Sequence, residues 1–234
     1  MSKNEKKLET QLSFPLTLEN VRLAIVGLGY VGLPLAVEFS KKFSTVGFDV
    51  DEERINQLKN GFDRTKEVTS SALIDAKDLS LVSDIQRLVC ANVFIITVPT
   101  PVDRNKRPDL SHLKNASKTV GQVITRGSVV IFESTVFPGA TEEVCVPILE
   151  KVSGLKFNEE FFVGYSPERV NPGDQARTIP NIVKITSGST PDAAEFINKL
   201  YERIIEAGTF LAQSIQIAEA AKVIENTQRD VNIA

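Results

Sequence analysis

Short apolar runs alternate with longer amphipathic segments along most of this chain. The apolar runs end in glycine, proline or polar turns, as buried strands do, while the amphipathic segments repeat their apolar positions at helical spacing. We predict strands at residues 21–27, 44–51, 92–101, 128–135, 161–170 and 181–188. We predict helices at residues 31–42, 51–61, 109–126, 138–151 and 191–208. Residues 62–90 have a mixed pattern.

Alternating strands and helices of this kind favour one fold class. Strand-helix-strand units place consecutive strands parallel, and the connecting helix crosses over on one face of the sheet. We therefore predict an α/β fold, with a doubly wound parallel sheet and helices on both faces. Residues 1–20 are expected to form a flexible arm, and residues 21–208 the folded domain.

The last segment, residues 209–234, is predicted to be the start of a long connecting helix. It contains no glycine, no proline and no polar tail that would stop a helix. Ile217, Ala221 and Ile224 form an apolar face, which we expect to pack on the domain. A helix without a stop signal indicates that the chain is the first half of a longer protein, whose second domain follows this helix.

Composition narrows the range of functions. The 234 residues include 27 Lys and Arg against 30 Asp and Glu, a net charge of -3, which argues against nucleic acid or an anionic membrane as a partner. No apolar stretch approaches the roughly 18 residues of a membrane helix, and the polar N-terminus lacks a secretory signal, so we expect a cytoplasmic protein. One His and two Cys make neither a disulfide framework nor a metal site. Acid–base chemistry therefore falls to Asp, Glu, Lys, Tyr or bound water.

A glycine turn lies between the first strand and the first helix. Gly27, Gly29 and Gly32 form a G-x-G-x-x-G motif, and Asp49 ends the next strand. In a Rossmann-type dinucleotide fold the first glycine makes the tight turn, the second admits a pyrophosphate and the third lets helix and strand pack closely. Asp49 would bind the adenosine ribose and repel a 2′-phosphate, favouring NAD over NADP. The alternative is a structural turn in which Asp49 caps the next helix, although Asp51 is the better candidate for that cap.

Three later strands also end in polar turns. The side chains concerned are Thr97 and Thr100 after the first of these strands, Glu133, Ser134 and Thr135 after the second, and Glu168, Arg169 and Asn171 after the third. In open α/β sheets, ligands bind outside the carboxyl ends of the strands. We therefore expect a cofactor and substrate cleft along this edge of the sheet.

The final helix adds a polar face. Lys222, Asn226 and Arg229 are spaced i, i+4, i+7 and so share one side of the helix. Such a face is often only solvated. The functional alternative is that Lys222 and Asn226 donate hydrogen bonds to a reacting oxygen that gains negative charge.

Together these segments resemble the UDP-glucose/GDP-mannose dehydrogenase family. The resemblance covers residues 21–234 and is closest to the UDP-N-acetylglucosamine 6-dehydrogenase branch of bacterial capsule and Vi-polysaccharide synthesis. It rests on six segments in order: VRLAIVGLGYVGLPLAVEFS, GFDVDEERI, ITVPTP, ESTVFPGAT, YSPERVNPG and AEAAKVIENTQRDVNIA.

The resemblance implies an activity and a set of site residues. Members of the family oxidise the C6 alcohol of a nucleotide sugar to a carboxylate in two hydride transfers to two NAD, and an enzyme cysteine traps the intermediate aldehyde as a thiohemiacetal. By motif, the residues expected at NAD are Tyr30, Val31, Asp49, Arg54, Thr100 and Thr135, beside the three glycines. The expected catalytic residues are Thr135, Glu168, Lys222 and Asn226. The expected substrate contacts are Glu168, Arg169, Val170, Lys222, Asn226 and Arg229. The full-length enzyme is expected to be a homodimer.

One departure from the family concerns its nucleophilic cysteine, which lies downstream of the helix that ends this chain. Cys90 and Cys145 lie away from the carboxyl ends of strands and are expected to be small buried hydrophobic residues. We therefore expect the isolated chain to bind NAD without oxidising a nucleotide sugar. Two alternatives stay open, a non-catalytic NAD-binding regulatory module and another Rossmann dehydrogenase of the 3-hydroxyacid type. The runs YSPERV and KVIENTQRD argue against the latter.

Overall fold

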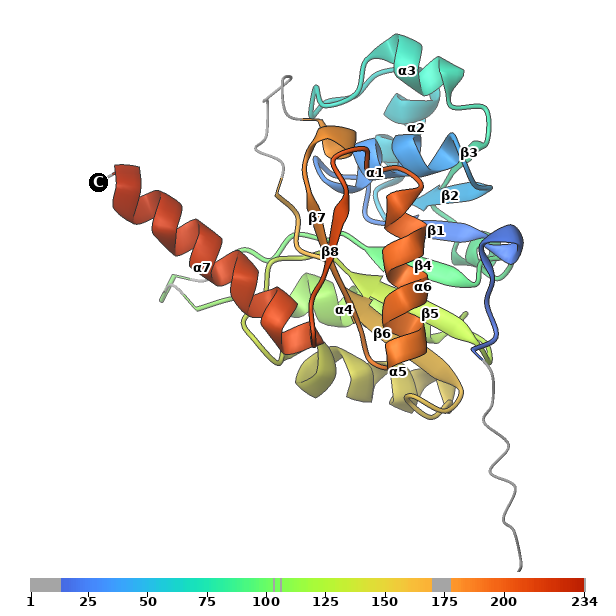
Figure 1. Cartoon of the computed structure of the whole chain (residues 1–234). Helices are drawn as coiled ribbons and strands as arrows, with labels where there is room; N and C mark the ends of the chain where they lie inside the picture. The colour runs from blue at the N-terminus through green and yellow to red at the C-terminus, as the bar shows by residue number, and fades with distance from the viewer. Residues whose placement is uncertain (1–13, 103, 106, 170–177, 234) are drawn as a thin grey trace, which may run out of the picture.

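A computed structural model describes residues 14–102, 104–105, 107–169 and 178–233 of the chain. In these residues one eight-stranded sheet has the order β3-β2-β1-β4-β5-β6-β7-β8 (Figure 1). The strands are β1 (Leu23–Val26), β2 (Thr45–Phe48), β3 (Leu79–Val82), β4 (Val93–Ile96), β5 (Ser128–Phe132), β6 (Phe161–Tyr165), β7 (Lys184–Gly188) and β8 (Thr209–Leu211). The α-helices are α1 (Gly32–Ser40), α2 (Glu52–Lys59), α3 (Ser70–Asp75), α4 (Ser111–Gly121), α5 (Val146–Ser153), α6 (Pro191–Glu202) and α7 (Ile215–Ile233).

The predicted α/β fold with helices on both faces is confirmed. Successive residues of a strand point to opposite faces, so a strand covered on both faces must be apolar throughout. In β1, Ala24 and Val26 join a core that also contains apolar side chains of α4, α5 and α7. Leu23 and Ile25 join a second core, built with α1, α2 and α6. This two-sided burial explains the unbroken apolar runs in the sequence.

The sheet departs from the prediction in one pair of strands. Every other neighbouring pair is parallel, but β6 and β7 run antiparallel, with Gly164 opposite Gly188 and Tyr165 opposite Ser187. A parallel pair requires a crossover connection, usually a helix. Between β6 and β7 the described residues contain only one short 3-10 helix, η4 (Ile179–Asn181). The reversal pairs the end of β7 with the end of β6 and brings the start of β7 beside the segment that follows β6. There the Ser166 hydroxyl donates to the Ile185 carbonyl, and Lys184 meets Glu168.

Both predicted boundaries of the domain need correction within the described residues. Residues 14–20 do not form a free arm, because the ring of Phe14 lies 5.0 Å from that of Phe162 and 5.1 Å from that of Phe196. At the other end, residues 209–211 were assigned to the connecting helix but form β8, which pairs with β7. The sheet therefore extends three residues past the predicted boundary at residue 208.

The predicted mixed region, residues 62–90, contains α3, β3 and the 3-10 helix η2 (Ile85–Leu88). The helix predicted at residues 138–151 begins instead with a π-helical turn, η3 (Thr141–Cys145), which continues into α5. No helix among the described residues is long and apolar enough to cross a membrane.

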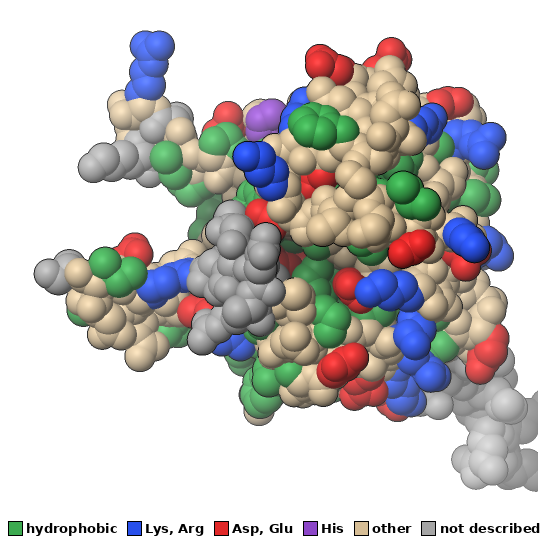
Figure 2. Space-filling view, turned by 90° about the horizontal axis from the view of Figure 1, so that it is seen from above, with side chains coloured by type: hydrophobic (Ala, Val, Ile, Leu, Met, Phe, Trp, Pro, Cys, Tyr) green, Lys and Arg blue, Asp and Glu red, His purple; other side chains and the backbone are tan. Residues whose placement is uncertain are grey.

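The last helix, α7, begins against β6 and β7 and then projects beyond the domain (Figure 1). Its buried residues are Ile215, Ala218, Glu219 and Lys222. The predicted packing face is therefore wrong, since Ile217 and Ile224 are 48% and 64% exposed. Seen from above, the projecting end carries hydrophobic, basic and acidic side chains together (Figure 2).

A buried carboxylate explains which face of α7 packs. Glu219 is fully buried and accepts hydrogen bonds from the backbone N–H groups of Gly139 and Thr141, at 2.5 and 2.9 Å, and from the Thr141 hydroxyl at 2.7 Å. Hydrogen bonds to a buried charge have strict geometry and are costly to lose. They fix the rotation of α7 about its axis more firmly than its small apolar side chains could.

Candidate cofactor and substrate site

A cavity of about 120 Å³ lies at the carboxyl edge of the sheet. The turns after β1, β4 and β5 and the segment after β6 supply its walls. Its lining residues are Gly29, Tyr30, Val31, Thr97, Val98, Pro99, Thr100, Glu133, Ser134, Thr135 and Glu168. The structure therefore brings the glycine turn and all three polar turns to one place, as the strand ends predicted.

The three glycines of the turn differ in what surrounds them. Gly27 has φ +96°, a conformation that only glycine adopts readily. A Cβ on Gly32 would collide with the Gly27 carbonyl and the Thr97 hydroxyl, so this position holds α1 close to the strands. A Cβ on Gly29 would meet no atom within 4 Å. The backbone of Gly29 is thus open on the side where a Cβ would lie.

Asp49 and Asp51 have separate partners. The Oδ2 atom of Asp49 accepts a hydrogen bond from the backbone N–H of Leu28, at 2.8 Å, inside the glycine turn. Asp51 caps α2 by accepting from the backbone N–H of Arg54, at 3.1 Å. Asp49 is therefore not the cap of α2, and its carboxylate lies beside the turn, where a ribose of a dinucleotide would lie.

Arg54 is buried beneath the glycine turn. Its Nε donates to the Leu28 carbonyl at 2.9 Å, and its Nη2 lies 2.7 Å from Oδ1 of Asp63, with both side chains 1% exposed. Burial by itself raises the pKa of the Asp63 carboxyl. Hydrogen bonds from the Thr65 hydroxyl and from the backbone N–H groups of Thr65 and Val68 together outweigh burial, so the pKa lies below its usual value. The Nη1 atom of Arg54 has no hydrogen-bond partner among the described residues.

The turns after β4 and β5 are tied to each other. The Thr100 hydroxyl donates to the backbone carbonyl of Thr135, at 2.6 Å, and the Ser134 hydroxyl donates to that of Val98, at 2.5 Å. These bonds use the hydroxyls of Thr100 and Ser134 and fix the turn that carries Thr135. The side chain of Thr135 is exposed at the cavity.

A buried cluster of charged side chains extends inward from the cavity wall, to which Glu133 and Glu168 belong. Nζ of Lys184 is 2.7 Å from Oε2 of Glu133 and 3.2 Å from Oε2 of Glu168, and the Tyr201 hydroxyl donates to Oε1 of Glu133. Burial raises the pKa of Glu133 to about 7, against the lowering effect of Lys184. Burial by itself lowers the pKa of Lys184, but the two carboxylates outweigh it and the pKa lies above its usual value.

The polar face of α7 meets this cluster. Lys222 is buried, and its Nζ donates to the backbone carbonyl of Glu168. Burial lowers the pKa of Lys222, although Glu225 and Glu168 partly oppose that effect. Further along the helix, Arg229 donates to Oδ1 of Asn226 at 2.5 Å.

The segment that follows Glu168 also contacts α7. Nε of Arg169 pairs with Oε1 of Glu225, at 3.3 Å, while its backbone N–H donates to the carboxylate of Glu168 at 2.6 Å. Val170 and Asn171, which the sequence also placed at this site, lie outside the described residues.

The sequence did not predict the inward placement of Lys184, Tyr201, Asp63 and Glu219. One signal was present for Lys184, because it is the only charge in the run NIVKITSG. Asp63 lies in the region without a clear pattern. Tyr201 and Glu219 lie on helices, where a polar side chain at one position does not reveal its partner.

The two cysteines differ. Cys145 is buried as predicted, and burial raises the pKa of its thiol to about 12. Cys90 is exposed, which corrects the prediction, because it follows η2 on a surface turn instead of entering β4. Neither lies in the cavity.

Within the described part of the chain, no group of three or more His, Cys, Asp or Glu side chains could hold a metal ion.

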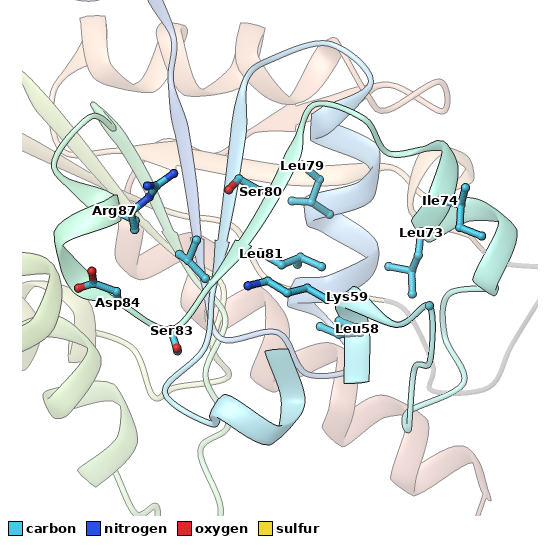
Figure 3. A pocket seen from close by; sticks show the side chains of 12 residues that line it. Leu58, Lys59, Leu73, Ile74, Leu79, Ser80, Leu81, Ser83, Asp84 and Arg87 are labelled. Atoms are coloured by element: carbon cyan, nitrogen blue, oxygen red, sulfur yellow. The ribbon is translucent and has the colours of Figure 1, made fainter. Parts of the chain in front are cut away.

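A larger groove, of about 660 Å³, lies beside β3, the outermost strand on one side of the sheet, and between β3, α2 and α3 (Figure 3). Leucine side chains from all three elements line it together with Lys59, Asp84 and Arg87. It contains none of the residues predicted to bind a ligand.

An eight-stranded, mostly parallel sheet with a glycine turn and an acid after the second strand defines a dinucleotide-binding domain. Residues 21–205 match the NAD binding domain of the UDP-glucose/GDP-mannose dehydrogenase family. The chain therefore belongs to this family, as the resemblance implied.

Individual relatives agree with this assignment. The chain is 58% identical over 217 residues to the UDP-N-acetyl-D-glucosamine 6-dehydrogenases of Pseudomonas aeruginosa and Salmonella typhi, covering 93% of this chain and 51% of each relative. Among solved structures, the UDP-D-ManNAc dehydrogenase of Pyrococcus horikoshii has a TM-score of 0.84 at 37% identity, over 91% of this chain and 51% of that one. The chain thus spans about half the length of the relatives it matches.

Proposed function

We propose that this chain is the NAD-binding half of a nucleotide-sugar 6-dehydrogenase, which oxidises the C6 alcohol of UDP-N-acetylglucosamine to a carboxylate with two NAD. The observation that carries the proposal is the cavity itself. The open backbone of Gly29 lines one wall, and Glu168, with Lys222 bonded to its carbonyl, closes another. The names of the two relatives at 58% identity support the choice of sugar.

The residues of the turn fit NAD. The pyrophosphate would lie against Gly29 at the start of α1, where free backbone N–H groups and the helix dipole favour negative charge. Asp49 would bind the adenosine ribose with the lone pairs that Leu28 and Asp51 leave free. Arg54 would support the NAD site from beneath the glycine turn. Its Nη1 atom, which has no hydrogen-bond partner among the described residues, would be its remaining donor. Tyr30, Val31 and Thr100 would line the nicotinamide end.

The other site residues, on α7 and after β5 and β6, would transfer protons and orient the substrate. Bound NAD supplies one chemistry, the acceptance of hydride from C6. Burial lowers the pKa of Lys222. Lys222 would accept the proton of the C6 hydroxyl and then, with Asn226, donate a hydrogen bond to the C6 oxygen where negative charge develops. Thr135 would hold a water at the cavity, and Glu168 would take its proton during hydrolysis. Arg169, Val170 and Arg229 would contact the nucleotide sugar.

This proposal includes two statements about the longer protein. We place it in the cytoplasm, in keeping with two free cysteines and no membrane-spanning helix among the described residues. We also propose that the longer protein is a homodimer. The nucleophilic cysteine of the longer protein would come from the part that follows α7.

Two measurements test the proposal. Calorimetric titration of this chain with NAD tests the cofactor site. A steady-state NADH assay on the longer protein, with UDP-N-acetylglucosamine, UDP-glucose and UDP-N-acetylmannosamine compared at equal concentration, tests the reaction and the sugar. We expect NAD binding by the chain and the highest kcat/KM for UDP-N-acetylglucosamine. NAD binding without NADH production from any of the three would instead favour a regulatory NAD-binding module.

A further inference from the structure

Leu28, the residue between Gly27 and Gly29, is held at both of its backbone polar atoms by charged side chains. Its N–H donates to Oδ2 of Asp49 at 2.8 Å, and its carbonyl accepts from Nε of Arg54 at 2.9 Å. The Leu28 side chain is fully buried in the second core. The path of the glycine turn therefore depends on where the carboxylate of Asp49 and the guanidinium of Arg54 are fixed.

Asp63 is the second partner of the Arg54 guanidinium. Its Oδ1 lies 2.7 Å from Nη2 of Arg54, and both side chains are 1% exposed. A planar guanidinium that is bonded to separate acceptors at Nε and at Nη2 cannot turn without breaking one of the two contacts. The position of Asp63 thus sets the orientation in which Arg54 reaches Leu28.

The carboxylate of Asp63 is itself held by the backbone around it. Oδ1 also accepts from the N–H and the hydroxyl of Thr65, at 2.9 and 2.7 Å. Oδ2 accepts from the N–H groups of Glu67 and Val68, at 2.9 and 3.0 Å. Within this loop Lys66 has φ +59°, which few residues other than glycine adopt. Such a conformation persists only where its surroundings determine it, and here the loop closes around one carboxylate.

We propose that Asp63 is a positioning residue for the NAD site, which acts through Arg54 to hold the backbone of Leu28, and with it the glycine turn, in the conformation that receives the pyrophosphate. Residues 63–68, the Asp63 loop, are then coupled to cofactor binding although none of them lines the cavity. This inference rests on the proposed position of NAD at the glycine turn. A purely structural Asp63 would matter for folding but not for the affinity of the folded chain for NAD.

A second ion pair joins the Asp63 loop to the start of α2, but it lies in solvent. Nη2 of Arg64 is 2.8 Å from Oδ2 of Asp51, and the two side chains are 48% and 38% exposed. Exposed ion pairs contribute little because water screens them, whereas removing one partner of a buried pair leaves an uncompensated charge. The contact between Asp63 and Arg54 is therefore the stronger connection between the loop and the site.

The first test compares NAD affinity, by calorimetry, in the four combinations of Asp63→Asn and Arg54→Met. Asp63→Asn keeps the size of the side chain but removes the charge that Arg54 meets, so we expect NAD to bind about 10-fold more weakly. In the Arg54→Met background the same change should weaken NAD by less than about 2-fold, because the path to Leu28 is already lost. Equal losses in both backgrounds, or no loss in either, would overturn the proposal.

The control is Thr69→Ala, which removes the side-chain cap of α3 directly after the Asp63 loop. It should lower the melting temperature but leave NAD affinity within about 2-fold of the unmutated value. A loss of affinity as large as that of Asp63→Asn would show that loosening anywhere in this region impairs the site. The specific role given to Asp63 would then be wrong.

The second test uses the chain without NAD. In 1H–15N NMR spectra, Asp63→Asn should shift the amide signals of Leu28 and Gly29, whereas Thr69→Ala should leave them in place. Unshifted signals in a folded Asp63→Asn would overturn the proposal. If these signals shift but the unmutated chain does not bind NAD, the cofactor site fails and the link from Asp63 to the turn stands.

If Asp63→Asn does not fold, hydrogen exchange on the unmutated chain replaces it. Coupling between two sites is reciprocal, so NAD at saturation should slow exchange of the amides of Glu67 and Val68, which donate to Asp63. Exchange of the Ala72 amide, which donates to Thr69, should not change. In Arg54→Met saturated with NAD, the slowing should disappear. Exchange that NAD leaves unchanged, or slowing that persists in Arg54→Met, would contradict the proposal.

Discussion

The carboxylate of Glu219 accepts two hydrogen bonds from Thr141, one from the backbone N–H at 2.9 Å and one from the hydroxyl at 2.7 Å. This buried contact joins α7 to the start of η3. Lys222 follows Glu219 by less than one helical turn, so the same contact sets where Lys222 reaches the carbonyl of Glu168. Placement of the candidate catalytic lysine thus depends on a residue outside the cavity.

Glu219→Ala should destabilise the chain. The substitution leaves the N–H groups of Gly139 and Thr141 buried without their acceptor, at a cost of about 3 kcal/mol. Urea unfolding followed by circular dichroism measures this loss. Asp230→Ala, at an exposed position of the same helix, is the control and should change stability by less than about 0.5 kcal/mol. Equal stability of the two variants would contradict the anchoring role of Glu219.

Alanine at two glycines of the turn should have different effects. Gly29→Ala meets no atom within 4 Å, so it should fold normally but bind NAD at least about 10-fold more weakly, because the methyl group lies where the pyrophosphate approaches. Gly32→Ala collides with the Gly27 carbonyl and should lower the melting temperature. Thermal unfolding and NAD calorimetry on both variants check this. Normal NAD affinity in Gly29→Ala would exclude that position as the pyrophosphate contact.

Asp49 should set the preference for NAD over NADP. A carboxylate facing a 2′-phosphate is a close like-charge contact, which costs several kcal/mol. Asp49→Ser should weaken NAD binding modestly and reduce the ratio of NADP to NAD dissociation constants, as measured by calorimetry. Asp51→Ser keeps a capping side chain on α2 and is the control, with an unchanged ratio. Equal affinity of the unmutated chain for both cofactors would show that Asp49 does not contact the ribose.

Glu133 should make stability depend on pH. Its folded-state pKa is about 7, above the ordinary value of 4.5, so between these values the folded chain keeps a proton that the unfolded chain releases. The stabilisation from this proton is present below pH 4.5 and is lost as pH rises through 7. Relative to Glu133→Gln, the free energy of unfolding of the unmutated chain should therefore fall from pH 5 to 7, by at most about 1.4 kcal/mol per pH unit.

Urea unfolding at several pH values measures that difference. Titrating groups away from Glu133 contribute equally to both proteins and cancel, so the difference reports Glu133 together with its partners Lys184 and Glu168. Glu195→Gln, at an exposed carboxyl whose pKa is lowered by Lys199, should show no such fall relative to the unmutated chain. A flat difference between the unmutated chain and Glu133→Gln would mean that Glu133 is ionised throughout this range.

Lys222 should affect turnover far more than cofactor binding. In the longer protein, Lys222→Ala should lower kcat by about 100-fold or more, because the amine is assigned to the reacting oxygen, while the dissociation constant for NAD changes little. Steady-state NADH formation and NAD calorimetry on the same preparation separate the two effects. Lys199→Ala, on the surface of α6, is the matched control. A variant with normal kcat and weak NAD binding would move Lys222 to the cofactor site.

The sequence by itself determined the local features. Apolar strands followed by amphipathic helices specify a two-sided α/β sheet, because burial of both faces leaves a pattern that neighbouring residues display. The sequence also showed the glycine turn, because Gly27, Gly29 and Gly32 lie within six residues of one another. It showed Asp49 as well, because that residue directly follows the next strand, β2, which pairs with β1. Cleft formation at the carboxyl edge also followed from the sequence, since parallel strands bring successive turns together.

Only the tertiary structure decided which distant side chains meet. α7 has two candidate faces of similar apolar character, and the hydrogen bonds of Glu219 to Gly139 and Thr141, about 80 residues earlier, select the face that carries Ile215 and Lys222. Lys184 faces two glutamates because β7 runs antiparallel to β6. The apolar pattern of a strand does not show whether its neighbour runs parallel or antiparallel. Such contacts depend on geometry between segments far apart in the chain, and the free energy of a buried charge depends on every partner that geometry supplies.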